Sequence, residues 1–326
     1  MGIRKKTLFI FLPTIRRFSR LLTISNNVTS KQDGVGAQVQ RLLAIASLSK
    51  LLGIPFVQKE FQEVAVHPLD PYQSQKNYKE FIDNLNFYFK FEQKSILGKK
   101  SKNIEVESVS LVKLFFLGVY STITRSRINL EILAPYNIVD LVPESYLKIR
   151  SQLTNFYESK PKRQGQKYIV IHYRQGVGGK VIYPGQKISR ELDEAYFLKV
   201  IDDHASIDFS TISCIVLTDA PLKDTKYEVP ENQRYLWENT PNYLDGTMYI
   251  KGHSFPMFKE RFKKLEIVRG GDPIEALRWM AHAELLFLSR SSLSYLGGVL
   301  NEHGAVYAEG NFWHPPLPKW KLSLKP

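Results

Sequence analysis

Short apolar runs alternate with helix-patterned segments along most of this chain of 326 residues. Parallel strands need a crossover connection between them, and that connection is usually a helix, so such alternation is typical of parallel α/β sheets. The expected strands are 21–25, 54–57, 168–173, 212–218 and 285–289, and the expected helices are 37–52, 193–203, 273–283 and 292–302. The sequence therefore predicts an α/β fold in which ligands bind beyond the carboxyl ends of the strands.

A charged segment without apolar side chains, residues 160–165, separates two such alternating regions. At about 150 residues per domain the length also favours two domains. We therefore expect one α/β domain at 1–160 and a second at 161–326, with a cleft between them. Between 68 and 137 the pattern is weak, with helical suggestions at 78–87 and 110–117, and a helix is expected at 143–157.

The excess of basic residues lies almost entirely in the first half of the chain. Residues 1–165 hold 25 basic and 13 acidic side chains, whereas residues 166–326 hold 20 and 19. A cationic half favours partners that carry phosphate, which are an anionic membrane leaflet, a nucleic acid or a phosphorylated substrate. Because the chain contains no nucleic-acid-binding motif, we expect no nucleic-acid partner. The alternative is that the basic excess of residues 1–165 binds no partner and only keeps the protein soluble.

The single cysteine, Cys214, lies in an apolar run and is expected to be a buried strand thiol. No apolar stretch is long enough to span a membrane. The apolar segment 7–15 is interrupted by Pro13 and lacks a cleavage site typical of a signal peptide. We expect a cytoplasmic protein, peripheral on the inner membrane if the basic half binds lipid.

Two glycines, Gly34 and Gly36, precede the first expected helix, and Gln38 follows them. Glycine lets the backbone approach a ligand closely, and a helix amino terminus favours a phosphate. The alternative is an ordinary tight turn.

The expected strand 168–173 contains His172 and leads directly to Arg174, and a glycine-rich loop follows at 176–179. Residues two apart in a strand point to the same side. An arginine fixed at a strand end can bind a phosphate through two nitrogens. The alternatives are a salt bridge for Arg174 and a hydrogen-bonded core position for His172.

Polar side chains also follow the next two expected strands. The carboxylate of Asp219 could accept from a ribose hydroxyl or a base N–H, or it could cap a turn through Pro221. Three hydroxyls, those of Ser291, Ser292 and Ser294, begin the last expected helix. Together with the amides of a helix start they suit an anion, although serines there also serve as caps.

Five segments resemble motifs of the α-1,2/α-1,6-fucosyltransferase superfamily, and of glycosyltransferase family 11 above all. The resemblance covers roughly residues 21–317. The segments are Gly34-Val35-Gly36-Ala37-Gln38, His172-Tyr173-Arg174, Arg190 to Phe197, Thr218-Asp219-Ala220, and Asp272-Pro273 through Gly298.

This resemblance implies a GT-B fold, in which two Rossmann-like domains face a cleft. The donor, with GDP-fucose the leading candidate, would bind domain 161–326, and a glycan or lipid-linked acceptor would bind domain 1–160. It implies no cofactor and no metal.

The resemblance also implies a role for each matching residue. Arg174 would neutralise the donor diphosphate, and Ser291 and Ser292 would hold it. His172 would lie against the nucleoside, and Gly34 and Gly36 would close over the phosphates. It does not identify the base that deprotonates the acceptor, for which Asp33 is a guess.

The chain departs from the family motifs at several positions. Gln175 replaces a second arginine, Ala276 replaces the acid that reads guanine, and Tyr295-Leu296 replace a tryptophan pair. Another nucleotide sugar is therefore a second possibility for the donor. A catalytically silent relative that only binds a nucleotide or glycan is the alternative function.

Overall fold

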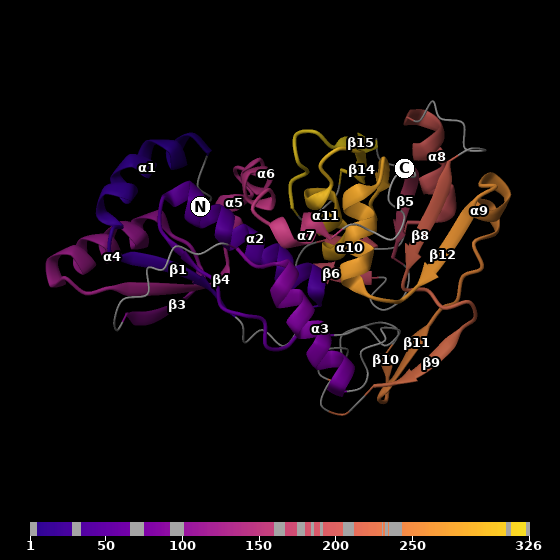
Figure 1. The fold of residues 1–326 in the computed structure, drawn as a ribbon, viewed down its shortest axis with the longest axis horizontal. Coiled ribbons are helices and arrows are strands. Elements are labelled where there is room, and N and C mark those ends of the chain that lie inside the picture. The colour runs from indigo at the N-terminus through magenta and orange to yellow at the C-terminus, as the bar shows by residue number, and fades with distance from the viewer. Residues whose placement is uncertain are drawn as a thin grey trace. The chain divides into compact units, whose positions relative to one another are not determined.

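The computed structural model divides the chain into two compact units (Figure 1). Unit 1 comprises Met1–Ala65 and Lys79–Ser159, and unit 2 comprises Val66–Tyr78 and Lys160–Pro326. The structure describes residues 5–27, 34–65, 75–91, 101–159, 167–174, 180–183, 186–189, 192–204, 212–229, 231, 234, 243–310 and 314–323. The expected linker at 160–165 and the glycine-rich loop at 176–179 lie outside these residues.

Unit 1 contains a four-stranded parallel sheet with the order β2-β1-β4-β3. Its strands are β1 (Leu22–Asn26), β2 (Phe56–Val57), β3 (Lys102–Ser108) and β4 (Ile128–Ala134). The even-numbered positions of β1, β3 and β4 are mostly apolar, whereas Thr23, Ser25, Asn129 and Glu131 occupy the other face. One face of this sheet is therefore apolar and the other is polar.

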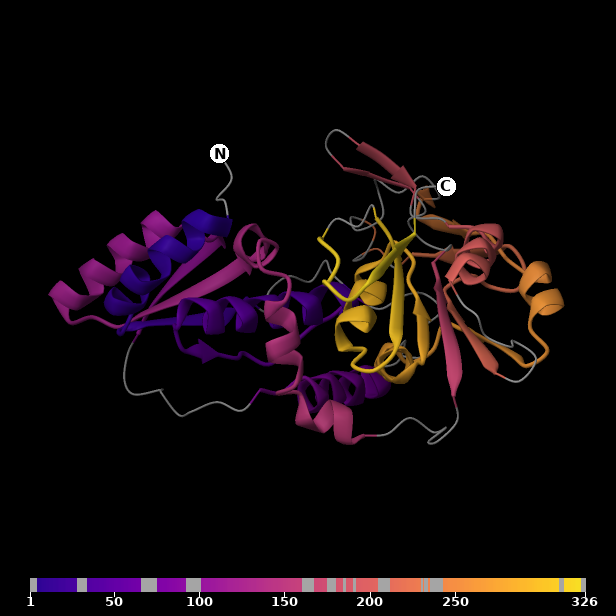
Figure 2. The same cartoon turned by 90° about the horizontal axis from the view of Figure 1, so that it is seen from above.

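The helices of unit 1 differ in how they are buried. They are α1 (Lys5–Phe18), α2 (Val35–Leu52), α3 (Gln75–Tyr88), α4 (Leu111–Thr124), α5 (Tyr136–Val139), α6 (Ser145–Arg150) and α7 (Thr154–Glu158). Helix α2 is buried on nearly all sides and ends at Gly53, whose φ of 69° is the left-handed conformation that glycine adopts easily. Helices α1 and α4 lie side by side in both views (Figures 1 and 2).

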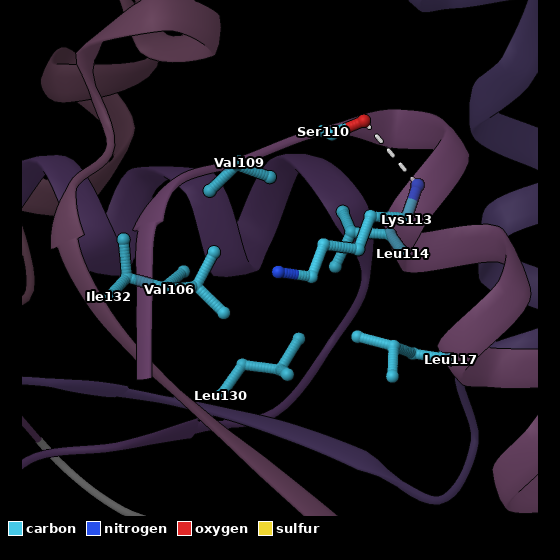
Figure 3. Close-up of a pocket in the computed structure, with 8 residues that line it drawn as sticks. All are labelled: Val106, Val109, Ser110, Lys113, Leu114, Leu117, Leu130 and Ile132. Carbon is cyan, nitrogen blue, oxygen red and sulfur yellow. Dashed lines mark hydrogen bonds between the residues drawn. The ribbon is translucent and has the colours of Figure 1, made fainter. Parts of the chain in front are cut away.

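Helix α4 packs on the apolar face of this sheet and leaves a small pocket there (Figure 3). Side chains of β3, β4 and α4 line it, namely Val106, Val109, Ser110, Lys113, Leu114, Leu117, Leu130 and Ile132. The free space of about 10 Å³ inside it is barely enough to admit one water molecule, and its walls are almost entirely apolar. This pocket is a packing gap and is too small for a substrate.

Unit 2 is built on a six-stranded parallel sheet with the order β12-β8-β5-β13-β14-β15. Its strands are β5 (Tyr168–Tyr173), β8 (Ser213–Thr218), β12 (Leu265–Arg269), β13 (Leu285–Phe287), β14 (Ala305–Glu309) and β15 (Lys321–Ser323). Numbered along the chain, this order is 3-2-1-4-5-6, the strand order of the Rossmann fold. The order reverses between β5 and β13, so these neighbouring strands flank the topological switch point.

The described residues of unit 2 from 167 onward form the helices α8 (Glu194–His204), α9 (Pro256–Arg261), α10 (Pro273–His282) and α11 (Ser292–Leu300). Asp272 caps α10 by accepting from the Ile274 amide at 2.7 Å, and Pro273 occupies the first helical position. Unit 2 also has two small antiparallel sheets. The first pairs β6 (Lys180–Tyr183) with β7 (Gln186–Ser189). The second consists of β9 (Thr225–Glu228), β10 (Tyr243–Leu244) and β11 (Thr247–Ile250).

The strands of the large sheet are buried, as expected for parallel strands covered by helices. The β5 residues from Tyr168 to Tyr173 are all buried, and Cys214 on β8 is fully buried within the apolar core. Helix α11 approaches its surroundings closely at Gly298, where a Cβ would lie 2.5 Å from the Trp320 ring. A small residue is required there because an aromatic ring cannot shift as a flexible side-chain end can.

The predicted α/β class is confirmed: each of the two units is built on a Rossmann-like parallel sheet. The expected strands and helices of unit 2 are present to within a few residues. The single helix predicted at 143–157 is wrong, because the backbone leaves the helical conformation at the buried Leu153 and forms two short helices, α6 and α7.

Helix α1 was not predicted, since Pro13 lies inside it. Proline removes one backbone hydrogen bond, and burial of Leu8, Leu12 and Ile15 on one side of the helix stabilises α1 nonetheless. Within the part of the chain that the structure describes, no helix combines the length and the hydropathy that crossing a bilayer requires.

Candidate functional site

The candidate site lies at the carboxyl ends of β5, β8 and β13 in unit 2. These three strands are neighbours in the sheet, and β5 and β13 flank the switch point. In open α/β sheets, ligands bind in the crevice outside the strand ends at such a point. His172 is the penultimate residue of β5, Arg174 and Asp219 directly follow β5 and β8, and Ser289 follows β13.

The side chain of His172 bridges the switch point. Its Nδ1 lies 3.0 Å from the Ser289 Oγ and 2.5 Å from the Ser294 Oγ. The Ser294 Oγ also accepts from the Ser289 backbone N–H at 3.1 Å. His172 is 5% exposed, and both serines are fully buried. The carboxyl end of β5 is thereby joined to the turn after β13 and to the first turn of α11.

His172 is a neutral imidazole at neutral pH. Burial lowers its pKa to about 4, and the positive charge of Arg174 acts in the same direction, whereas Asp219 opposes the shift. A histidine with this pKa does not exchange protons near pH 7, so its part in the site is to hold neighbouring groups in position.

Arg174 and Asp219 form an ion pair across adjacent strand ends. The Arg174 Nε lies 3.0 Å from the Asp219 Oδ2, with the two side chains 25% and 8% exposed. Their proximity follows from the register, because Tyr173 on β5 pairs with Thr218 on β8. Of the alternatives that the sequence left open, Arg174 makes the salt bridge and Asp219 is its partner. A guanidinium has five N–H donors, so it can bind a carboxylate through Nε and phosphate oxygens through other nitrogens.

The serines at the start of α11 have different environments. Ser291 is the N-cap, and its Oγ accepts from the Leu293 amide at 3.3 Å. Ser292 is the first helical residue and is half-buried. Ser294 is fully buried and contacts His172 and Ser289, so it stabilises the turn and presents no hydroxyl at the protein surface.

An ion pair that the sequence analysis missed fixes the same turn. Two guanidinium nitrogens of Arg290 bind both carboxylate oxygens of Glu309, the last residue of β14. The two side chains are 11% and 1% exposed. The available signal was a charged residue at the end of each of two apolar runs, but only the pairing of β13 with β14 brings them together.

The residues predicted in the first domain belong to unit 1. Gly34 is the N-cap of α2, with an extended conformation. Gly36 was expected in a loop but lies in the first turn of α2, because the helix begins at Val35. The Gln38 Nε2 donates to the Glu63 carbonyl at 3.0 Å, and its side chain is buried. Gln38 therefore anchors α2 to the segment after β2, while Asp33 lies outside the described residues.

A Cβ added at Gly34 would meet the Ala65 carbonyl at 3.6 Å, which is an ordinary contact. Its φ of −72° also suits any residue. Packing within the described part of unit 1 therefore does not require glycine at this position.

Of the residues that depart from the family motifs, Tyr295 contributes to the packing of unit 2. Tyr295 is fully buried, donates to the Pro315 carbonyl at 2.8 Å and packs edge-on against Trp320. Ala276 lies in the first half of α10, and Gln175 lies outside the described residues. Among the residues for which the structure gives positions, no cluster of three His, Cys, Asp or Glu side chains could hold a metal ion.

No protein-family model matches this chain. No curated protein matches it either. Two solved structures of UDP-GlcNAc 2-epimerase from Methanocaldococcus jannaschii are similar in part. The first is 11% identical with a TM-score of 0.28, and the match covers 96% of this chain and 69% of the epimerase. The second, solved with UDP-GlcNAc and UDP, is 10% identical with a TM-score of 0.23, covering 95% and 67%.

Proposed function

We propose that this protein is a glycosyltransferase that transfers a sugar from a nucleoside-diphosphate sugar to a glycan or a lipid-linked acceptor, with inversion and without a metal. The observation that carries the proposal is the bridge from His172 to Ser289 and Ser294. It joins the strand that ends in Arg174 to the start of α11, at the point of a Rossmann-like sheet where phosphates bind.

In the proposed reaction, the acceptor hydroxyl oxygen attacks the anomeric carbon of the donor sugar. The bond from that carbon to the diphosphate oxygen breaks, and the nucleoside diphosphate leaves with the electron pair. A base takes the proton of the acceptor hydroxyl. Negative charge grows on the diphosphate as the bond breaks, so groups that bind the leaving diphosphate more tightly than the intact donor lower the barrier.

Arg174 is the residue we assign to this charge. The ion pair with Asp219, 3.0 Å from Nε to Oδ2, keeps the guanidinium near the strand end before a ligand arrives. The amides of the first turn of α11, together with Ser291 and Ser292, form a second group that suits the same anion. With a pKa of about 4, His172 is excluded as the base near neutral pH and is assigned a positioning role.

GDP-fucose is the leading candidate for the donor, from the resemblance of the motifs. Ala276 stands where those motifs have the acid that reads guanine, so a donor with another base is the second candidate. The resemblance of the motifs also makes Gly34, at the exposed start of α2, a candidate for a phosphate contact, whereas Gly36 is buried in the first turn of that helix. The basic first half of the chain supports an acceptor at an anionic inner membrane leaflet.

The proposal is tested by two measurements on the full chain. Thermal shift against a panel of nucleoside diphosphates should show one base raising the melting temperature by about 5–10 °C at a ligand concentration near 100 times Kd. Hydrolysis or transfer from the matching donor sugar should then be detectable. Binding without any turnover would identify a silent relative, and the absence of binding to every nucleotide would contradict the proposal.

A further inference from the structure

The outward faces of α1 and α4 carry a concentration of exposed apolar side chains. Thirteen large apolar side chains are exposed among the described residues, and seven of them lie on these two helices. They are Phe9, Ile10, Phe11, Val112, Phe116, Tyr120 and Ile123. The exposures are large, reaching 72% at Ile10 and 76% at Ile123. We call these seven residues the α1–α4 patch.

The patch faces away from the body of unit 1. On α4 the buried residues are Leu111, Leu114, Gly118 and Ser121, which form one helical stripe. The patch residues 112, 116, 120 and 123 fall on the opposite side of the helix, at spacings of four, four and three. On α1 the buried residues are 8, 12 and 15, so residues 9 to 11 surround the outward side.

The two helices form one surface. Both views place them side by side (Figures 1 and 2). Phe18 of α1 contacts Phe115 of α4 edge to face, with centroids 5.4 Å apart. A Cβ at Gly118 would lie 2.6 Å from the Phe18 carbonyl, so glycine permits this close crossing. The apolar side chains of both helices are thereby presented together.

Basic side chains predominate in the two segments that carry the patch, and one of them, Lys5, pairs with the Glu144 carboxylate at 2.8 Å. Residues 5–26 hold five basic and no acidic side chains, and residues 110–130 hold three basic and no acidic ones. Lys6, Arg17, Arg20 and Arg125 are exposed. Two copies of this face would bring like charges together at close range, which disfavours a homodimer. An anionic surface with an apolar interior satisfies both the charge and the exposed apolar area.

We propose that the α1–α4 patch binds the surface of an anionic phospholipid bilayer. The phenylalanine and isoleucine side chains insert at the boundary between headgroups and acyl chains, and Tyr120 lies at headgroup level. The exposed lysine and arginines bind lipid phosphates, with their aliphatic parts along the apolar surface. The attachment is reversible and weakens as salt rises, because part of the attraction is electrostatic.

Vesicle co-sedimentation of the full chain tests this surface. The probe is a vesicle of phosphatidylcholine with 30% phosphatidylglycerol, compared with phosphatidylcholine alone, at low and high salt. We expect binding to the anionic vesicles only, reduced at high salt. The double variant Ile10→Asp/Ile123→Asp should bind about tenfold or more weakly, since it removes two inserted side chains and adds two negative charges.

The matched control is Leu222→Asp/Leu244→Asp, which changes two exposed leucines of unit 2 and should leave vesicle binding unchanged. Melting temperatures of both double variants should equal that of the unchanged chain, because all four side chains are exposed. Equal binding to neutral and anionic vesicles, or equal binding of the Ile10/Ile123 variant, would overturn the proposal. So would a dimer in gel filtration that the same variant dissociates.

The inference is independent of the proposed transfer reaction, since vesicle binding is measured without donor or acceptor. Donor hydrolysis measured in solution distinguishes a failure of the membrane proposal from a failure of the transfer proposal. If the patch variant retains hydrolysis and loses vesicle binding, both proposals stand. A chain that binds vesicles through the patch but hydrolyses no donor refutes the transfer reaction alone.

Discussion

The Nε of Arg174 lies 3.0 Å from the Oδ2 of Asp219, and the two residues follow adjacent parallel strands. This pair places a cation at the carboxyl end of the sheet, next to a carboxylate that is itself mostly buried. A preformed arrangement of this kind requires no reorganisation when charge develops on a leaving group.

Replacing Arg174 with alanine should abolish transfer, with a loss of at least about 10²-fold in kcat, because one preorganised donor to the developing charge is removed. The fold should remain intact, as judged by circular dichroism and the melting temperature. The matched control is Arg261→Ala, which removes a more exposed arginine paired with Asp202 in the same unit and should leave kcat unchanged. Retained transfer in Arg174→Ala would show that the site is elsewhere.

The free energy of unfolding should fall as the pH is lowered from 6.5 to about 4, because His172 has a folded pKa of about 4 and an ordinary unfolded value of 6.5. Between these values the unfolded chain binds a proton that the folded chain does not. The contribution is about 3 kcal/mol over the whole interval and constant above pH 6.5.

Urea unfolding at pH 7, 5.5 and 4.5 measures this dependence. His172→Gln removes the titrating group, so its stability should be lower at pH 7 yet fall less steeply on acidification. Parallel slopes for the two proteins would contradict the buried neutral state of His172.

Gly34→Ala separates a ligand role from a structural one. The conformation and surroundings of Gly34 accommodate a Cβ, with the nearest described atom 3.6 Å away. The melting temperature should therefore be unchanged, while the affinity for the nucleotide found in the thermal-shift panel should fall, because the added methyl group keeps the backbone away from the phosphates. Unchanged affinity would remove Gly34 from the proposed donor site.

Breaking the pair between Arg290 and Glu309 should be strongly destabilising. Glu309→Gln leaves a buried guanidinium without its counter-charge, which costs about 3–5 kcal/mol. The double variant Arg290→Met/Glu309→Leu removes both charges and should recover most of this loss. Guanidinium chloride unfolding of the three proteins is the measurement, and a double variant no more stable than Glu309→Gln would contradict the interpretation.

Strands β5, β8 and β13 of unit 2 were predictable because parallel strands covered on both faces read as continuous apolar runs. Strands β12, β14 and β15 of the same sheet were not predicted. Strand β4 was missed since it carries Asn129 and Glu131. Asn129 accepts from Thr23 and donates to Ser25, and Glu131 pairs with Lys59. These partners lie on β1 and after β2, about 70 to 110 residues away, so the local sequence does not reveal why the polar side chains are tolerated.

The places of the candidate residues in the fold were predictable one by one, but the contacts between them were not. The positions of His172, Arg174 and Asp219 at strand ends follow from the apolar runs before them. That Asp219 pairs with Arg174, and that Ser294 contacts His172 over 122 residues of sequence, depends on the strand order of the sheet. Composition and local spacing carry no information on that order.

The burial of Cys214 makes the chain suitable for fluorescence labelling. Its thiol is fully buried and burial raises its pKa, so it reacts poorly with maleimide dyes, and the sequence has no other cysteine. Cysteines introduced at exposed positions of the two units, such as Ser126→Cys and Lys223→Cys, would be the reactive sites. Energy transfer between dyes attached there would report the distance between the units, with and without nucleotide, in a protein whose native thiol stays in place.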